Sequence, residues 1–232
     1  MKQSWRFIII FIALMALWNT IIIKPIKLFT VFLHELGHAF MALITGSNIT
    51  GLSIYFNEGG YVTSLPKDWF SAFLIANGGY LGSVFFAICI LLLQRTRIKK
   101  YIIGFIAIVF LIVTFRYSGI ISFTMLYSVV FAIFALIVYM IQKESLHDWV
   151  IEIIGIGSIT YAIYDTFVDT VLMQINYQLG LFKFGKMPVT DAVQLARLTH
   201  IPAVVWGVIW LVIAIIAVYA VVFKRKGRSA RR

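Results

Sequence analysis

Hydrophobic residues along this 232-residue chain form long runs separated by short polar stretches. Runs of about 20 apolar residues have the length of a helix that crosses a lipid bilayer. The runs are apolar on every face, whereas the strands of a membrane β-barrel alternate, so a barrel is excluded. The pattern predicts an all-α, polytopic transmembrane bundle of about six to seven helices. The candidate spans are residues 7–23, 28–45, 69–93, 101–115, 118–141, 149–175 and 201–223.

Two stretches between these runs read as non-helical. Residues 49–64 carry β-branched and aromatic side chains around Asn57-Glu58-Gly59-Gly60, a pattern typical of a short β-hairpin. Residues 176–200 form a polar connection before the last run. We therefore expect residues 1–223 to form one integral membrane domain.

The composition supports this picture. Hydrophobic residues make up 62% of the chain and charged residues 12%, which excludes a soluble enzyme, a disordered segment and a disulfide scaffold. Six of the 20 basic residues lie in positions 224–232, which predicts a cytoplasmic tail that faces anionic lipid headgroups. The tail carries no aromatic residue for base stacking, so nucleic acid is not the expected partner.

Positive charges also predict an orientation. The basic loop at residues 94–100 and the tail are both placed in the cytoplasm, with four crossings between them. Seven spans then put the N-terminus, with Lys2 and Arg6, on the outside. The compact chain and its basic tail favour a bacterial cytoplasmic membrane.

The strongest chemical signal is His34-Glu35-Leu36-Gly37-His38, inside an apolar run. Two histidines four residues apart lie on one face of a helix and can share a zinc ion, while the glutamate between them can act as general base. Ionisable residues at membrane depth are costly and usually functional. The sequence therefore predicts zinc bound by His34 and His38, with Glu35 as the catalytic base.

A catalytic zinc site usually has a third protein ligand. Asp165 and Asp169 are four residues apart in the sixth run and are the candidates. Both could bind the metal, or one could bind while the other orients a histidine. A proton relay or a helix-packing hydrogen bond is the alternative for this pair. Thr190-Asp191 reads as a helix N-cap in preference to a ligand, and His147 and His200 read as interfacial.

Several motifs together resemble one family. They are His34–Ala39, the hairpin ending at Gly59–Val62, Asn77–Ser83, and the Asp165/Asp169 helix followed by Thr190–Ala192, Pro202 and Trp206-Gly207. Their combination resembles the site-2 protease family of intramembrane zinc metallopeptidases, in its short B-like branch. The Leu-Asp-Gly motif that typically carries the third ligand in that family is missing here.

The resemblance implies further assignments. Asn77 is expected to bind the backbone of an extended substrate. Gly78 and Gly82, and likewise Gly79 and Ser83, form small-xxx-small pairs that let helices approach closely. The hairpin is expected to add a substrate as an extra strand.

The sequence thus predicts a zinc-dependent endopeptidase that hydrolyses a peptide bond in or near a transmembrane segment of a membrane protein or peptide substrate. Two alternatives stay open. One is a metal or proton transporter without hydrolysis. The other is an inactive relative that binds and retains membrane clients.

Overall fold

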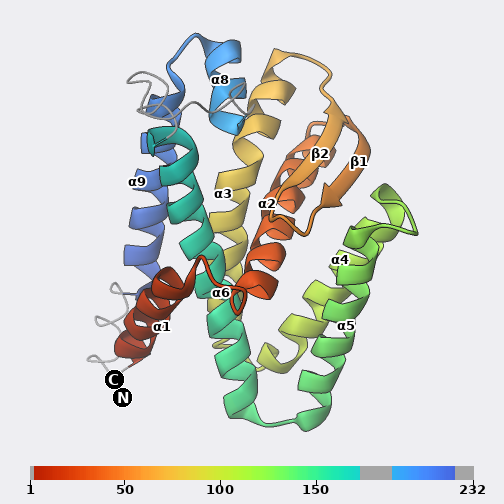
Figure 1. Ribbon diagram of the computed structural model, residues 1–232, viewed down its shortest axis with the longest axis vertical. Coiled ribbons are helices and arrows are strands. Elements are labelled where there is room, and N and C mark those ends of the chain that lie inside the picture. The colour runs from red at the N-terminus through yellow and green to blue at the C-terminus, as the bar shows by residue number, and fades with distance from the viewer. Residues whose placement is uncertain (1–2, 173–189, 223–232) are drawn as a thin grey trace.

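The computed structural model describes residues 3–172 and 190–222 (Figure 1). Six of the described helices are long and apolar enough to cross a membrane, which confirms the predicted helical bundle. The regular elements are α1 (Gln3–Leu17), α2 (Lys24–Ile44), β1 (Asn48–Ile54), β2 (Gly60–Leu65), α3 (Trp69–Leu93), α4 (Ile102–Tyr117), α5 (Phe123–Ile141), α6 (Glu144–Thr166), α8 (Asp191–Thr199) and α9 (Ala203–Val222). A 3-10 turn at Lys99–Tyr101 precedes α4, and a π-helical turn at Phe167–Leu172 follows α6.

The first apolar run forms a helix that is too short to span. With 15 residues, α1 reaches roughly 22 Å, less than the roughly 30 Å hydrocarbon core. Its Arg6 guanidinium lies 2.8 Å from the buried Glu152 carboxylate of α6 and above the Trp149 ring. Gln94, at the end of α3, donates to the same carboxylate at 3.1 Å. Arg6 therefore lies at the same end of the bundle as the basic loop, and the prediction that places the two at opposite ends is wrong.

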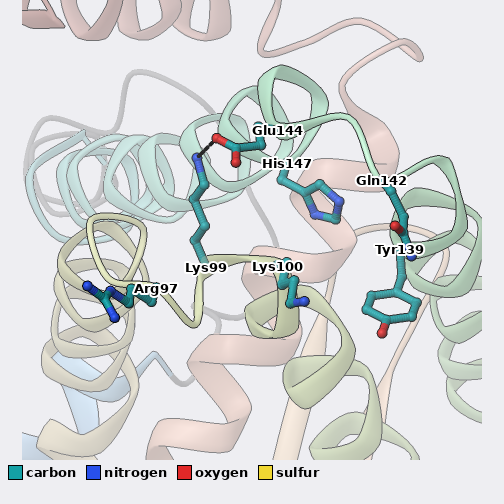
Figure 2. Close-up of a pocket in the computed structure, with 7 residues that line it drawn as sticks. All are labelled: Arg97, Lys99, Lys100, Tyr139, Gln142, Glu144 and His147. Atoms are coloured by element: carbon teal, nitrogen blue, oxygen red, sulfur yellow. Dashed lines mark hydrogen bonds and ion pairs between the residues drawn. The ribbon is translucent and has the colours of Figure 1, made fainter.

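The same end is held together by a second ion-pair group. Lys99 Nζ lies 3.2 Å from a carboxylate oxygen of Glu144 (Figure 2). It lies equally close to Asp148 Oδ1, so the α3–α4 loop is joined to the first two turns of α6. These contacts fix the basic loop at residues 94–100 against α6. The basic tail lies outside the described residues.

The predicted hairpin is confirmed. β1 and β2 pair antiparallel from Asn48↔Leu65 to Ile54↔Gly60, with an irregularity between Ile49 and Gly51. The outer edge of β1 is already occupied: the Ile54 amide donates to Thr124 Oγ1 at 2.9 Å, and the Ser118 hydroxyl donates to the Leu52 carbonyl. The sheet has two strands, so β2 is its other edge.

The expected non-helical connection at 176–200 is wrong in its last part, because residues 191–199 form α8. Residues 173–189 lie outside the described part of the chain. Two tryptophans anchor the C-terminal end of α8: Trp69 Nε1 donates to the Leu198 carbonyl at 2.9 Å, and Trp206 Nε1 donates to Thr199 Oγ1 at 3.2 Å. Ala192 and Leu195 pack beneath it against α3 and α9.

Glycines set the distance between α2 and α3. A Cβ added at Gly82 would lie 2.6 Å from the Gly37 Cα, and a Cβ at Gly78 would lie 2.7 Å from the Gly37 carbonyl oxygen. Both neighbours are backbone atoms, which cannot rotate out of the way as a side chain can. The expected close helix approach at Gly78 and Gly82 is confirmed, and it brings α3 against the histidine face of α2.

We expect Gly82→Ala to lower the stability of the bundle by about 1–3 kcal/mol, because the added methyl group must push α2 and α3 apart. Gly104→Ala is the matched control. It also replaces a helical glycine, but its Cβ would meet nothing within 4 Å. Alanine is the better helix former by about 1 kcal/mol. Thermal unfolding in mild detergent should show a lower midpoint for Gly82→Ala alone. Equal midpoints for the two variants would contradict the packing argument.

Candidate metal centre and active site

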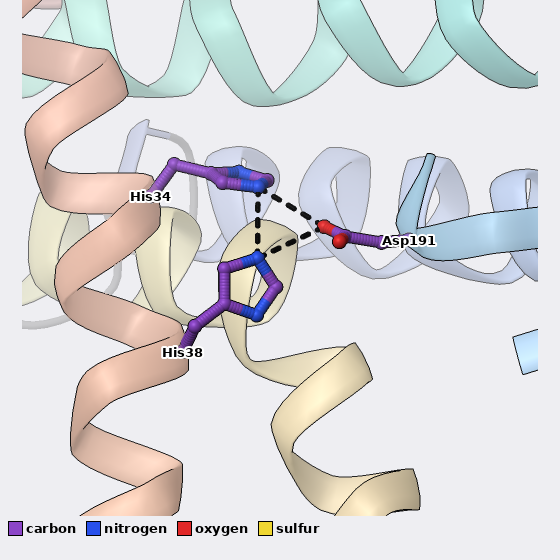
Figure 3. Close-up of side chains that lie close together, drawn as sticks. All are labelled: His34, His38 and Asp191. Carbon is purple, nitrogen blue, oxygen red and sulfur yellow. Dashed lines mark hydrogen bonds and ion pairs between the residues drawn. The ribbon is translucent and has the colours of Figure 1, made fainter. Parts of the chain in front are cut away.

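The two motif histidines lie in the middle of α2, one turn apart and both buried. Their Nε2 atoms are 3.2 Å from each other (Figure 3). On the far side of its ring, His38 places Nδ1 2.7 Å from the Ile75 carbonyl oxygen of α3. A carbonyl only accepts, so Nδ1 is the donor, and this contact fixes the ring orientation with Nε2 directed toward His34.

A carboxylate from a distant part of the chain lies within contact distance of both histidines. Asp191 Oδ2 lies 3.0 Å from His34 Nε2 and 3.1 Å from His38 Nε2 (Figure 3). Asp191 is the first residue of α8, while the neighbouring Thr190 is the N-cap whose hydroxyl accepts from the Val193 amide. The predicted cap is therefore formed by Thr190, which leaves the Asp191 side chain directed at α2.

This arrangement fits a divalent metal ion. Three atoms that carry lone pairs converge in a buried space, and a neutral His38 has no proton on Nε2 to offer to its two neighbours. A cation at their centre removes that conflict. Ligand atoms bound to zinc at about 2.0–2.2 Å in tetrahedral geometry lie roughly 3.3 Å apart, close to the separations observed here.

The electrostatics of Asp191 agree with a charged ligand. Burial alone would raise the pKa of its carboxyl group, but without a metal ion the charge of a protonated His38 and hydrogen bonds from both histidines hold that pKa well below its usual range. The carboxylate therefore stays ionised in its buried position, which is the form that binds a cation.

Aromatic rings and one glycine complete the walls. Tyr80 and Tyr161 meet the His34 ring edge-on, with centroid distances of 4.7 and 5.7 Å. A Cβ at Gly79 would lie 2.5 Å from His38 Nε2 and closer still to His34. Any side chain at Gly79 would therefore occupy the space in which the ligand atoms meet, so this glycine serves the site as well as helix packing.

The histidines open onto a cavity of about 790 Å³ that β2, α3, α6 and α8 also line. Glu35 lines this cavity and is 5% exposed. Gly60, at the start of β2, lies directly against it: a Cβ there would be 2.6 Å from Glu35 Oε1. The hairpin thus runs beside the glutamate and the metal ligands.

A family model described as Peptidase M50B-like matches residues 7–221. The chain belongs to the M50B-like peptidase family. No curated protein and no solved structure matches it. The family and the six apolar helices together make it a multi-pass integral membrane protein. Peptidases of the M50 group are generally zinc-dependent, and His34, His38 and Asp191 form a group that could hold the ion.

The third potential metal ligand in the structure is not one of the two aspartates expected from the sequence. Asp165 lines the cavity but does not belong to the cluster of potential ligand atoms, all within 4.8 Å of one another, that includes Asp191. The π-helical turn around Asp169 is described, whereas the side chain of Asp169 lies outside the description. In the described structure Asp191, and not Asp165, lies with the two histidines, because α8 packs against α3 and directs Asp191 at α2.

Asn77 forms hydrogen bonds within the bundle. Its Nδ2 donates to the Phe73 carbonyl at 2.9 Å, and its Oδ1 accepts from Trp210 Nε1 at 3.0 Å. The side chain faces α9 and does not line the cavity. Trp210 in turn stacks on Tyr80, which contacts His34. Asn77 therefore supports the wall of the site through Trp210 and Tyr80, and its expected contact with a substrate stays a prediction.

The metal ligands can be separated by one experiment. We expect about one zinc per chain in the purified protein and a loss of at least about 100-fold in zinc affinity for Asp191→Asn. Asp165→Asn, an equivalent change in the same cavity, should retain the metal. Zinc is measured by elemental mass spectrometry after dialysis against a weak chelator. Retention by Asp191→Asn with loss from Asp165→Asn would restore the original assignment.

Proposed function

We propose that this M50B-like peptidase is a zinc-dependent intramembrane endopeptidase that cleaves a membrane protein substrate in or near a transmembrane segment. The observation that carries the proposal is the convergence of His34, His38 and Asp191 beside Glu35, in one cavity lined by a sheet edge. A bacterial cytoplasmic membrane remains the proposed location.

The site residues have separate roles in the proposed reaction. His34, His38 and Asp191 would hold the ion. Bound there, zinc would polarise the scissile carbonyl and acidify a water molecule. Glu35, on the same helix and next to His34, accepts the proton of the attacking water and delivers it to the leaving amine. Burial of the site by α3, α6 and α8 limits access of bulk water to the reaction.

The free edge of β2 is proposed to hold the substrate. A peptide bond must be extended before a metallopeptidase can attack it, and main-chain pairing with a sheet edge binds an extended segment with little dependence on its sequence. β1 cannot serve, since its outer edge is taken by Ser118 and Thr124. Tyr61, Val62 and Ser64 of β2 line the cavity.

The catalytic role of Glu35 is tested by Glu35→Gln. We expect peptide hydrolysis to fall by about 100-fold or more, because a general base contributes roughly 10²–10⁴-fold, while zinc content stays at the wild-type level. The assay uses reconstituted protein and synthetic apolar peptides with a glycine- or proline-interrupted centre. Asp68→Asn is the control: it is a carboxylate-to-amide change at a helix N-cap outside the cavity. Full hydrolysis by Glu35→Gln would exclude this mechanism.

The same preparations separate the alternatives. A transporter should carry zinc into proteoliposomes that contain a zinc-sensitive dye, and Glu35→Gln should not abolish that uptake. A client-binding relative should retain peptides on the wild-type protein with full zinc content and no cleavage. The placement of Glu35 beside both the histidines and the β2 edge favours hydrolysis.

Proline substitutions test the sheet edge. Proline removes one backbone donor. We replace Tyr61, Val62, Thr63 and Ser64 by proline in turn, and we expect impaired cleavage by those variants in which the lost N–H points away from β1. The zinc content of those variants should be unchanged. Proline at a position whose N–H bonds to β1 should instead lower the unfolding midpoint of the protein. Unimpaired cleavage at every position that retains its fold would exclude strand addition.

A further inference from the structure

A second cavity lies at the end of the bundle that holds the basic loop. It has a volume of about 160 Å³ and is formed by the α3–α4 loop, the end of α5 and the first turn of α6 (Figure 2). Arg97, Lys99 and Lys100 line it, opposed by Glu144. Glu144 is paired with Lys99. Within the described residues, no ion pair neutralises Arg97 or Lys100, so the cavity carries an excess of positive charge.

One wall of this cavity is a buried histidine with an unsatisfied ring nitrogen. His147 is 3% exposed, and its Nδ1 has no hydrogen-bond partner among the residues that the structure describes. In Figure 2 its ring extends from α6 toward Lys100. An unpaired buried polar atom is costly and normally marks a partner that is missing from the protein itself. The ring therefore offers a nitrogen to a polar ligand, and with the proton on Nδ1 it would donate to an anion.

The backbone adds donors at the same place. Lys143, the N-cap position of the 23-residue α6, offers no side-chain cap to the first amides of that helix. The Leu146 and His147 amides bond back to the Lys143 carbonyl, so the amides before them are left for another acceptor. A helix N-terminus with uncapped amides favours an anion. A phosphate group could therefore be bound by Arg97, Lys100, the His147 ring and these amides.

An apolar groove begins where this cavity ends. Tyr139 lines both the cavity and a groove of about 410 Å³ between α4 and α5. Gly104 lies in that groove, and a Cβ there would meet nothing within 4 Å. Helix packing therefore does not require this glycine, in contrast to Gly78 and Gly82. Its missing side chain leaves room along the lipid-facing surface, beginning at the rim of the charged cavity.

We propose that the basic cavity and the α4–α5 groove form one binding site for an anionic phospholipid, with the phosphate at Arg97, Lys100 and His147 and an acyl chain beside Gly104. The charge of the cavity selects the headgroup, and its continuity with an apolar groove favours a lipid over a free phosphate ion. The site lies at the opposite end of the bundle from the hairpin and is independent of the proposed peptidase chemistry.

The proposal is tested by lipid binding to the purified, delipidated full-length protein. Native mass spectrometry or thermal shift is followed during titration with dioleoyl phosphatidylglycerol and with dioleoyl phosphatidylcholine, which share their acyl chains. We expect the anionic lipid to bind roughly tenfold more tightly, as expected for basic groups near a charged headgroup. Inorganic phosphate and glycerol phosphate, which lack the acyl chains, should bind far more weakly.

Variants separate the two halves of the site. Arg97→Gln with Lys100→Gln should remove the preference for the anionic lipid but keep binding of the zwitterionic one. The control is Arg95→Gln, which removes a charge from the same loop but does not line this cavity. Gly104→Phe should weaken both lipids by filling the groove. Its control is Gly119→Phe, at a glycine that also has open space around it but lies outside the groove.

Equal affinity for the two lipids would overturn the proposal, as would an unchanged preference in the double variant. Phosphate binding as tight as lipid binding would assign the cavity to a soluble anion instead. Unchanged lipid binding by Gly104→Phe would separate the groove from the site. Peptidase activity and zinc content are not part of the readout, so failure of the proposed function leaves this test intact.

Discussion

The close approach of α2 and α3 is the constraint on which the rest of the structure depends. Gly37, Gly78 and Gly82 let the two helix backbones touch, and Gly79 keeps the space between the histidines clear of any side chain. The same approach brings the Ile75 carbonyl to His38 Nδ1 and so fixes the orientation of that ring. One interface therefore holds the bundle together and shapes the metal centre. Membrane helices gain little from a hydrophobic effect between them, which makes such backbone contact the effective packing device.

The second layer of the site is built by long-range contacts. α8 carries Asp191 over α3, anchored by hydrogen bonds from Trp69 and Trp206. Asn77, Trp210 and Tyr80 form a continuous support behind His34. The hairpin is pinned at its other end, where the Lys27 ammonium pairs with Glu58 and Lys24 lies over the Phe56 ring. The hairpin, α3 and α8 are thus each held by polar contacts to neighbouring elements. This is how a buried site keeps its geometry without binding partners from solvent.

The two ends of the molecule carry different chemistry. Near the hairpin and α8, acids and histidines gather in a buried cavity that β2 also lines, and within the described residues β2 pairs with β1 alone. At the other end, basic residues and uncapped amides surround a small cavity beside an apolar groove, which is an arrangement for an anionic headgroup.

The sequence by itself determined the helical membrane class, the hairpin, the paired histidines and the neighbouring glutamate. These features are local: apolar run length, turn residues and i, i+4 spacing act within one element. Only the tertiary structure brought Asp191 to the two histidines. Asp191 is 157 positions from His34 along the chain. Its place at the start of a helix was explained by an N-cap, so the sequence offered no separate reason to expect a ligand there. The i, i+4 spacing of Asp165 and Asp169 instead favoured those two residues as ligands. The contacts of Asn77 and the end of the bundle at which α1 lies were also decided by tertiary contacts, with Trp210 and with Glu152 respectively. A side chain's partner across the bundle depends on how helices fold back on one another, which no spacing within a helix records.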